Sequence, residues 1–386
     1  MNVVFLSPHF PPNFFPFCVR LKQMGATVLG IADEPFDRLR PELQAALTEY
    51  YRVPDMNDYE ALLRGLGHFT ARHGKLDRLD SMSEHWLEIE GRLREDFNIP
   101  GLRPAQLLRG QRKSLMKEIF LEAGIPCARG RLCRTTADLE AFVAEAGYPV
   151  VAKPDIGVGA SKTYKLVSDR DLEAFAAEGL STDYLVEEFV DGAIVTYDGL
   201  TDRNGAVVFE SSMRYSRGVM DVVNDGTDLW YYAEREIPED LKRAGRVLVD
   251  AFGVRERFFH FEFFRLADGS LTALEVNLRP PGGLTVDMWN YQNETDLFLG
   301  WAQLLVTGRC DIPRPARWFC AYIGRKHRTV YRSSHEEVVQ HCGPWLVHHQ
   351  GLDDVFSAAI GNHGYILKSG SLAELEGAAA FIQARA

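Results

Sequence analysis

The segment from Phe258 to Leu278 constrains the fold of this 386-residue chain more than any other stretch. Its two halves are rich in apolar residues that alternate with others, and between them stands Asp268-Gly269. This dipeptide favours a tight turn, because both residues tolerate positive φ. The sequence therefore predicts an antiparallel β-hairpin in which Ala267 pairs with Ser270 across the turn.

The predicted register brings two acidic side chains face to face. Glu262 lies directly opposite Glu275, and Asn277 follows two residues later on the same face. The other face of the hairpin is expected to be part of a core, which fixes the register by burial. Its members are expected to be Phe259, Phe261, Phe263, Thr272, Leu274 and Val276.

Two glutamates in this arrangement lead us to expect a cation between them. Like charges directly across two strands repel, and with ordinary pKa values of about 4.3 both side chains are ionised at neutral pH. Carboxylate and amide oxygens suit Mg²⁺ or Mn²⁺, and magnesium usually leaves room for substrate phosphates. Glu262, Glu275 and Asn277 are therefore candidate metal ligands of a nucleotide site. The alternative is a solvated sheet face whose glutamates point into water.

Composition and charge narrow the class of protein. A hydrophobic content of 46% with 25% charged residues is that of a globular protein with room for two or three domains. The net charge of −11 and a pI near 5.5 argue against nucleic acid or an anionic membrane as the main partner. The opening MNVVFLSPHF lacks the basic start of a signal peptide, and no stretch has the length of a membrane span. We expect a cytoplasmic protein.

The cysteine pattern argues against disulfides and against a zinc cage. None of the six cysteines belongs to a C-x-x-C pair, so free thiols are expected. The group formed by His341, Cys342, His348 and His349 has a spacing that fits no common zinc motif, and we expect no metal there.

The first part of the chain is interpreted as a small α/β domain. Strands are predicted at Asn2–Ser7 and Thr27–Ala32 with a helix at Phe14–Met24 between them, and a further strand at Leu79–Met82. No G-x-G-x-x-G motif follows the first strand, which disfavours a dinucleotide-binding Rossmann domain. We place the end of this domain near residue 105.

Glycine and proline residues punctuate the rest of the chain. Residues 106–190 begin with a predicted helix at Leu107–Ala123 and form a small α+β lid. Residues 191–310 form a larger β-rich part that includes the hairpin. Residues 311–386 add strands and a terminal helix at Leu372–Arg385, which complete that part. The predicted fold class is therefore a multidomain combination of α/β and α+β.

A second candidate site follows an apolar strand. The run from Tyr148 ends in Lys153 and continues into a loop with Gly157, Gly159 and Ser161, which offers a cation and unobstructed N–H groups to phosphate. The loop is not a Walker A motif, because Ser161 stands where a glycine is required and a strand follows instead of a helix. An ordinary hairpin with a glycine turn is the alternative.

A third candidate element is the strand and turn from Tyr184 to Gly192. The main-chain groups of such a connector suit the edge of an adenine base, while Glu187 or Glu188 suits a ribose hydroxyl or the exocyclic amine. Phe189 and Val190 belong to the same connector. Alone the pattern is weak, because any edge strand with two solvated glutamates has the same sequence character.

Taken in order, these elements resemble the ATP-grasp superfamily of carboxylate–amine ligases. The resemblance covers roughly residues 105–310 and implies an ATP-grasp fold preceded by a βαβ pre-ATP-grasp domain. The branch that it favours is that of amino-acid ligases and carnosine-synthase-like enzymes. The elements are Lys113, G-I-P at 124–126, Lys153 with its loop, E-E-F-V-D-G at 187–192, H-F-E at 260–262 and E-V-N-L-R at 275–279.

The resemblance implies a site for ATP between the two halves of the fold. Lys113 and Lys153 would neutralise the phosphates, the loop 157–163 would close over them, and the connector from Glu187 to Val190 would hold the adenine. One departure concerns the ribose, because the family usually has a glutamate where this chain has Ile194. The ribose ligand must then come from elsewhere, with Glu187, Glu188 and Asp198 as candidates.

The resemblance also implies a reaction. Glu262, Glu275 and Asn277 match the family's ligands for Mg²⁺ or Mn²⁺, and Arg279 matches an arginine that contacts the transferred phosphate or the substrate carboxylate. The carboxylate would attack the γ-phosphate of ATP to give an acyl phosphate, which an amine then converts to an amide or peptide with release of ADP and phosphate. The candidate catalytic residues are Arg279, Lys153 and Arg217.

Closure and substrate binding are assigned to further positions. The polar loop around Arg214 and Arg217 is placed to shield an acyl phosphate from hydrolysis. Glu84 would hold an ammonium group, and the N–H groups of Gly282 and Gly283 would stabilise an oxyanion. A mobile solvated loop and a surface glutamate are the respective alternatives.

The expected partners are small-molecule carboxylates and amines, with amino acids or short peptides preferred, and a homodimer is left open. A biotin-carboxylase-like enzyme and an acid–thiol ligase on the same scaffold stay as alternatives. A nucleotide-binding regulatory protein with an inactive site is a third. Against it, only phosphate and metal chemistry requires two lysines, two glutamates, an asparagine and an arginine together.

Overall fold

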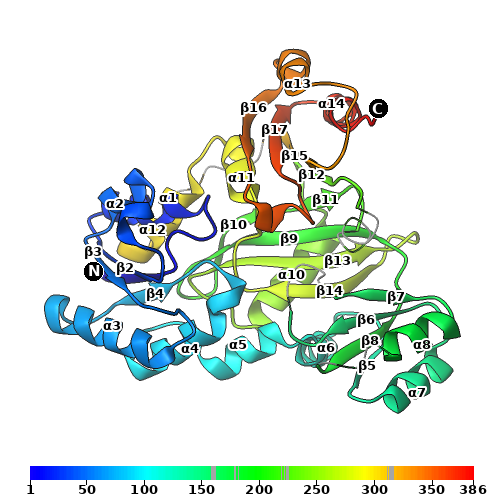
Figure 1. Ribbon diagram of the computed structural model, residues 1–386, viewed down its shortest axis with the longest axis horizontal. Coiled ribbons are helices and arrows are strands. Elements are labelled where there is room, and N and C mark those ends of the chain that lie inside the picture. Colours follow the sequence, from blue (N-terminus) through cyan, green and yellow to red (C-terminus); the bar gives the residue numbers. More distant parts are fainter. Residues whose placement is uncertain are drawn as a thin grey trace.

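Three β-sheets organise the chain in the computed structural model (Figure 1). A four-stranded N-terminal sheet and a small four-stranded sheet flank a nine-stranded sheet that continues to the C-terminal elements at the top of the view. This combination of parallel α/β and antiparallel layers confirms the predicted fold class. The structure describes residues 1–157, 162–177, 180, 182–218, 220, 222, 226–310, 312 and 317–386.

The N-terminal sheet is parallel and belongs to an α/β unit. Its elements are β1 (Asn2–Leu6), α1 (Phe15–Gln23), β2 (Thr27–Ala32), η1 (Phe36–Arg38), α2 (Pro41–Ala46), β3 (Glu49–Arg52), α3 (Tyr59–His73), β4 (Arg78–Asp80), η2 (Glu84–Trp86) and α4 (Leu87–Asp96). The strand order is β3-β2-β1-β4. Side chains of β1 alternate between two cores, Val3 and Phe5 with α1, and Val4 and Leu6 with α3 and α4. The predicted strands and helix are confirmed, with small shifts at their ends.

The single helix predicted at 107–123 is wrong. The structure has two helices there, α5 (Pro104–Gln111) and α6 (Lys113–Glu122). Arg112 between them is extended, and the Lys113 N–H donates to the carbonyl of Asp155 at 2.9 Å. The Asp155 carboxylate accepts from the Ser114 N–H at 2.8 Å. A capping residue far along the chain thus starts α6 at Lys113.

The small sheet is antiparallel and has the order β5-β8-β6-β7. Its elements are β5 (Gly130–Cys133), α7 (Thr136–Ala146), β6 (Val150–Pro154), β7 (Tyr164–Leu166), α8 (Asp169–Ala177) and β8 (Tyr184–Glu188). Helices α7 and α8 share a core with Val150, Ala152 and Val186. Because side chains alternate along a strand, Lys153 and Glu187 point to the opposite face. That face carries the charged groups described below.

The large sheet has the order β14-β13-β9-β11-β12-β15-β17-β16, with β10 paired to β9. Helix α10 packs on one face, and α1, α11 and α12 pack on the other. The terminal helix ends three residues earlier than predicted. The strands are β9 (Ala193–Thr201), β10 (Val207–Ser211), β11 (Met213–Tyr215), β12 (Trp230–Ala233), β13 (Phe258–Arg265), β14 (Leu271–Asn277), β15 (Phe319–Arg325), β16 (Leu346–Gly351) and β17 (His363–Ser369). The remaining helical elements are α10 (Glu239–Ala251), α11 (Thr285–Asn293), α12 (Leu297–Thr307), α13 (His335–Cys342), η3 (Asp354–Phe356) and α14 (Leu372–Ile382).

The hairpin of β13 and β14 confirms the predicted pair of Glu262 with Glu275. The predicted turn is wrong, because Leu266 rather than Ala267 bonds to Ser270, through its N–H and the Ser270 carbonyl at 3.0 Å. Gly269 supplies the left-handed residue of this longer turn, with φ of +86°.

A bulge in β14 restores the register at the glutamates. Glu262 pairs with Glu275 but the next residue, Phe263, pairs with Ala273, so Leu274 is the extra residue. Thr272 and Leu274 are consequently only partly buried, contrary to the prediction, and Ala273 takes the core position. The other predicted core residues are confirmed as buried, namely Phe259, Phe261, Phe263 and Val276.

A buried charge network fixes the N-terminal unit against the large sheet. Glu90 of α4 accepts hydrogen bonds from Arg94 and Arg257, each at 2.8 Å. Asp80 lies 3.7 Å from Arg94 and 3.6 Å from Arg257, the residue that precedes β13. Two acidic and two basic groups therefore balance in the interior, where an unpaired charge would be costly. The network holds η2, which carries Glu84, beside the hairpin.

No helix of the described part of the chain has the length and apolar character needed to cross a bilayer.

Candidate active site

The paired carboxylates of the hairpin each have a cationic neighbour. Glu275 Oε1 lies 3.0 Å from Lys113 Nζ, and Glu262 Oε1 lies 3.0 Å from His260 Nε2. Burial alone would raise the pKa of Glu275, but the ammonium groups of Lys113 and Lys153 hold it below the ordinary value. The two glutamate side chains keep 24% and 18% of their surface exposed, so a ligand can reach them.

Lys113 connects the hairpin to the glycine-containing loop. Besides its ion pair with Glu275, its ammonium group donates to the carbonyl of Gly157 at 2.9 Å. Burial lowers the pKa of Lys113, yet the carboxylates of Glu275, Glu84 and Glu187 together outweigh it, and the pKa lies above the ordinary value. Lys113 is therefore a fixed positive charge at the first residue of α6. The positive end of the helix dipole lies at the same place and strengthens the positive potential there.

Lys153 of the small sheet forms an ion pair with Glu187 of the connector. Glu187 lies between two lysines, with Lys153 on one carboxylate oxygen and Lys117 on the other. Burial would raise the pKa of Glu187, but both ammonium groups lower it. Sequence analysis missed Lys117, although it stands one helical turn after Lys113 and so on the same face of α6.

A histidine that sequence analysis did not assign links β9 to the hairpin. His260 Nδ1 lies 2.5 Å from Asp198, its cross-strand partner on β9, and Nε2 lies 3.0 Å from Glu262. Burial by itself lowers the pKa of His260, but the two carboxylates raise it to about 9. The Thr196 hydroxyl also bonds to Asp198. The sequence did hold a signal for His260, because a residue two positions before Glu262 on the same strand lies on the same face.

Arg279 contacts both the hairpin and Glu84 of the N-terminal unit, so these parts form one cluster of charged side chains with Lys113 and Glu275. Its Nη2 donates to the Asn277 carboxamide oxygen at 3.2 Å, and its Nε lies 3.5 Å from Glu84 Oε2. Burial raises the pKa of Glu84 to about 7, with Arg279 opposing and Glu275 adding to the shift. Glu84 Oε2 has no hydrogen-bond partner among the described residues. This carboxyl group is thus poised to gain or lose a proton near neutral pH.

The overall architecture matches that of solved enzymes. The crystal structure of an L-amino acid ligase from Bacillus licheniformis superposes with a TM-score of 0.76 at 19% identity, over 98% of this chain and 95% of that one. An ADP complex of N5-carboxyaminoimidazole synthetase from Staphylococcus aureus gives a TM-score of 0.75 at 15% identity, over 97% and 95% of the two chains. This chain has the ATP-grasp fold.

Sequence similarity reaches over shorter segments. The carbamoyl phosphate synthase large chain of Clavibacter michiganensis is 25% identical over 236 residues, which make up 57% of this chain and 20% of that protein. The matched segments of the first curated relatives span 12% to 25% of those proteins. No protein-family model matches the chain. The ATP-grasp fold therefore rests on the whole-chain structural match.

Within the ATP-grasp fold, the two arginines predicted for closure are not part of the cluster. Arg214 lies in β11 rather than in a loop, and its Nε is 3.7 Å from Glu234. Arg217 is exposed. Tyr215 between them stacks on Tyr231 with ring centroids 5.1 Å apart. Burial and the carboxylates of Glu262 and Asp198 raise the pKa of Tyr215, whereas Arg214 is exposed.

The phosphate loop and the connector are described in part. Gly157 accepts from Lys113, whereas Gly159 and Ser161 lie outside the described residues. Glu188 points away from Glu187 and binds Arg129 at 2.9 Å, and the ring of Phe189 lies under the Lys165 ammonium group at 3.6 Å. Val190 follows in the turn before β9. The ribose candidates Glu187, Glu188 and Asp198 all have ionic partners, so the ribose ligand stays a prediction.

The glycine pair stands after Arg279 at the start of α11. The Gly282 carbonyl accepts from the Thr285 hydroxyl at 2.9 Å, and the Gly283 carbonyl accepts from the Asn13 side chain at 2.6 Å. Both carbonyls thus point into hydrogen bonds within the protein. A Cβ built on Gly282 would have no heavy atom within 4 Å, so its backbone borders open space. An oxyanion role for the two N–H groups stays a prediction.

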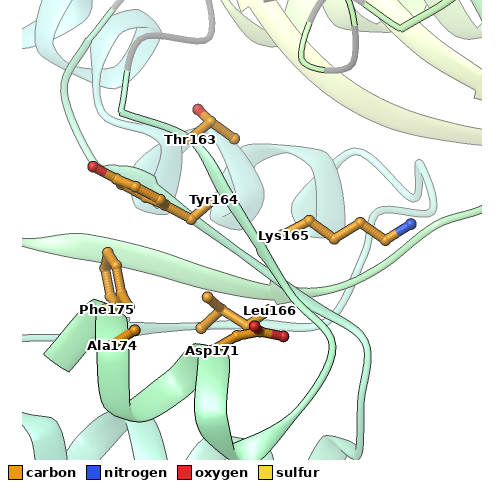
Figure 2. Close-up of a pocket in the computed structure, with 7 residues that line it drawn as sticks. All are labelled: Thr163, Tyr164, Lys165, Leu166, Asp171, Ala174 and Phe175. Atoms are coloured by element: carbon orange, nitrogen blue, oxygen red, sulfur yellow. The ribbon is translucent and has the colours of Figure 1, made fainter. Parts of the chain in front are cut away.

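A hollow of about 310 Å³ lies apart from this cluster, between β7 and α8 (Figure 2). The rings of Tyr164 and Phe175 lie close together with centroids 5.0 Å apart, whereas Lys165 points to the other side. Apart from Thr163, the last residue of the predicted phosphate loop 157–163, none of the predicted site residues lines it. The lining residues are Thr163, Tyr164, Lys165, Leu166, Asp171, Ala174 and Phe175.

Proposed function

We propose that this chain is an ATP-dependent carboxylate–amine ligase that forms an amide or peptide bond through an acyl phosphate and releases ADP and phosphate. The observation that carries the proposal is the position of Lys113, whose ammonium group contacts both the metal-ligand candidate Glu275 and the loop residue Gly157. One cation thereby joins the parts that phosphoryl transfer from a nucleotide requires, the phosphate loop and the carboxylate pair.

The donor set fits Mg²⁺ or Mn²⁺. Glu262 and Glu275 offer carboxylate oxygens from adjacent strands, and Asn277 offers a carboxamide oxygen on the same strand as Glu275. Hard oxygen donors in this number are what Mg²⁺ takes from a protein when phosphates supply the remaining ligands. A divalent ion held there would neutralise charge on the β- and γ-phosphates.

In the first step, a carboxylate oxygen of the acid bonds to the γ-phosphorus and the bond to the bridging oxygen of ADP breaks. Negative charge spreads over the transferred phosphoryl group, so fixed cations around it lower the barrier. Lys113 and Lys153 supply such charges, and each is now neutralised by a glutamate. Phosphate oxygens would take over these contacts when the nucleotide binds. Arg279 would hold the acid through its planar fork.

In the second step, the amine nitrogen bonds to the acyl carbon and phosphate leaves with the electron pair of the broken C–O bond. An ammonium substrate must first lose a proton to become a nucleophile. Glu84, with a pKa of about 7, would hold the ammonium group and take that proton at neutral pH. The N–H groups of Gly282 and Gly283 are the proposed stabilisers of the oxyanion.

Amino acids or short peptides are the proposed substrates. Arg279 and Glu84 lie side by side, 3.5 Å apart, and such a pair can bind a carboxylate and an ammonium group at adjacent positions. The structural likeness to an L-amino acid ligase supports the same choice.

The experiment that tests the function measures ADP and phosphate release from MgATP across pairs of amino acids and small carboxylic acids, with and without bicarbonate. Mass spectrometry of the active mixtures should find a product lighter than the acid and amine together by one water. Release that needs bicarbonate alone would favour a biotin-carboxylase-like reaction. Release that needs a thiol acceptor would favour an acid–thiol ligase. Binding of MgATP without turnover in any mixture would contradict the ligase proposal.

A further inference from the structure

Three histidines from separate elements meet in the C-terminal part of the chain, away from the carboxylate cluster. His335 is the first residue of α13, His349 lies in β16, and His363 is the first residue of β17. Figure 1 shows these elements at the top of the view, where β17 and β16 form the end of the large sheet that is remote from the small sheet. His349 pairs with Tyr365, two residues after His363, so both histidines lie on one face of the hairpin.

The three rings are close enough to share a ligand. One nitrogen of each ring lies within 4.8 Å of the corresponding nitrogens of the other two. The ring centroids of His335 lie 4.9 Å from His349 and 4.8 Å from His363, and the latter two are 5.7 Å apart. Nothing in the apolar core explains this contact, because the cluster is only partly buried and His349 is exposed.

The hydrogen bonding of the rings leaves nitrogen lone pairs available. His335 Nδ1 lies 2.9 Å from the Tyr365 hydroxyl, so with Nδ1–H as donor the Nε2 atom of His335 presents its lone pair. His363 Nε2 is buried and has no hydrogen-bond partner among the described residues. A buried polar atom without a partner is costly unless something binds it.

We propose that His335, His349 and His363 form a binding site for a divalent transition metal ion of the Zn²⁺ class. Three imidazoles suit Zn²⁺, Cu²⁺ or Ni²⁺ and do not suit Mg²⁺, which prefers oxygen. The site is therefore chemically distinct from the carboxylate pair of the hairpin. Its position on three elements would tie α13 to the hairpin of β16 and β17.

The geometry requires a small inward movement. With Zn–N distances of about 2.0–2.1 Å, the nitrogens of a tetrahedral site are about 3.3 Å apart, compared with up to 4.8 Å here. His349 can make this adjustment, because it is exposed and β16 is the last strand of the sheet. With three protein ligands, the fourth position of the ion is open to water or to a small ligand.

The surroundings are compatible with a cation. Burial and the two neighbouring rings lower the pKa of His363 to about 4, so this imidazole is neutral at pH 7, the form that binds metals. His327 and Arg325 also lower the pKa of His363, and Glu336 is the residue that follows His335 in α13. The tyrosine on His335 orients that ring in the manner of the hydrogen-bond partners of metal-bound histidines.

The histidines that sequence analysis considered for a metal are, apart from His349, placed elsewhere. His348 bonds to Gln350 and stacks on Tyr291, and the ring of His341 stacks on Phe381. Cys342 is buried in the core under α14. His335 and His363 were missed because the three ligands come from three elements with no short motif. His348 therefore serves as a matched control beside His349.

The experiment is a calorimetric titration of ZnCl₂ into the full-length protein with excess MgCl₂, added to compete with Zn²⁺ for the carboxylate pair. The wild type, His348→Ala and Glu275→Gln should each bind one Zn²⁺ ion per chain with similar affinity. His349→Ala and His363→Ala should bind at least about 100-fold more weakly, beyond the 10- to 100-fold loss typical for a partner of a ligand. Zn²⁺ should raise the melting temperature of the wild type and of His348→Ala. It should raise the melting temperature of His349→Ala and His363→Ala only weakly or not at all.

Two results would overturn the proposal. In the first, the wild type binds no Zn²⁺ under these conditions. In the second, His349→Ala and His363→Ala bind Zn²⁺ as tightly as the wild type, and a loss of binding in Glu275→Gln would then put the ion at the carboxylate pair. Because both histidines are at least partly exposed, their replacement by alanine should leave the fold intact, and a circular dichroism spectrum checks this.

Discussion

Lys113 and Glu275 form a 3.0 Å ion pair between the first residue of α6 and the middle of β14. The pair raises the pKa of Lys113 and lowers the pKa of Glu275, so both groups stay charged. The Glu275 carboxylate thus contacts the ammonium group that is the proposed partner of the nucleotide phosphates. Binding of MgATP should exchange this contact for a lysine–phosphate contact and a glutamate–metal contact.

Replacement of Glu275 by glutamine should abolish turnover and leave the fold intact. The amide keeps the shape of the side chain but removes the charge that a divalent ion requires and that now neutralises Lys113. We expect ADP release to fall by at least about 10²- to 10³-fold, the loss typical of removing one electrostatic contact to a transition state. A coupled ADP assay and a thermal melt on the same preparation measure both effects.

Glu210→Gln is the matched control for this substitution. Glu210 is also an ion-paired glutamate of the large sheet, but its partners Lys242 and Tyr197 lie on the side of α10. Its loss should lower stability slightly and leave turnover nearly unchanged. Near-normal activity of Glu275→Gln would show that the metal assignment is wrong.

Glu84 should make stability depend on pH between about 4.5 and about 7. Burial raises its pKa to about 7 in the folded protein from 4.5 in the unfolded chain. Between these values the folded state binds more protons than the unfolded state, so this group makes unfolding easier as pH rises. Above pH 7 the free energy of unfolding that is lost through Glu84 levels off at up to roughly 3 kcal/mol, since one pKa unit corresponds to about 1.4 kcal/mol.

Glu84→Gln should remove this dependence of the free energy of unfolding on pH. At pH 4.5 the variant and the wild type should have similar free energies of unfolding, and at pH 8 the variant should be more stable. Urea unfolding at several pH values measures the difference. A parallel set of curves for the two proteins would mean that Glu84 titrates normally. Under the ligase proposal, the variant should also lose activity, because it holds neither an ammonium group nor its proton.

The ion triplet of Lys117, Glu187 and Lys153 should show strong coupling. Lys153→Met leaves the buried Glu187 with one cation, and removing a partner of a buried ion pair commonly costs about 3–5 kcal/mol of stability. Adding Glu187→Gln to this variant should recover part of the loss, with a coupling energy of about 1–3 kcal/mol. Lys165→Met, in the neighbouring strand, should cost about 1 kcal/mol or less, because Lys165 is exposed and its ammonium group lies over the Phe189 ring. Additive effects of Lys153→Met and Glu187→Gln would contradict the proposed contact.

The pairing of Glu262 with Glu275 could be predicted because alternation and a turn dipeptide both act locally. The prediction was correct for the glutamates even though its turn was wrong, because the bulge at Leu274 offsets the longer turn. The predicted core positions Thr272 and Leu274, between the turn and the bulge and at the bulge itself, were therefore wrong. A bulge depends on the twist and packing of the whole sheet, and the strand sequence alone does not specify it.

The parts of the site that depend on distant contacts could not be predicted. The break before Lys113 is set by Asp155, which caps α6 from the loop after β6. The pair of His260 with Asp198 requires that β13 lie beside β9. The face that Arg214 occupies depends on β11 being a strand of the same sheet. Each of these follows from sheet order, which hydrophobic periodicity does not reveal.

Gly245 provides a test of how tightly α10 supports the site. A Cβ added there would lie 2.0 Å from Cδ1 of Tyr197, whose ring is fully buried against the sheet. Alanine normally stabilises a helix interior relative to glycine by roughly 0.5–1 kcal/mol. In Gly245→Ala the overlap should reverse this sign and lower the free energy of unfolding by about 1–3 kcal/mol. Chemical denaturation of the purified variant measures the change.

Gly67→Ala supplies the opposite expectation within the same chain. Gly67 also lies inside a helix, α3, but a Cβ there would meet no heavy atom within 4 Å, so this variant should gain up to about 1 kcal/mol. Activity should separate the two as well. Tyr197 stands between Thr196 and Asp198 in β9, and a shift of its ring moves the carboxylate that holds His260. Gly245→Ala should therefore reduce turnover together with stability, whereas Gly67→Ala should change stability alone. Stabilisation by both substitutions would show that α10 and Tyr197 are less closely packed than the structure has them.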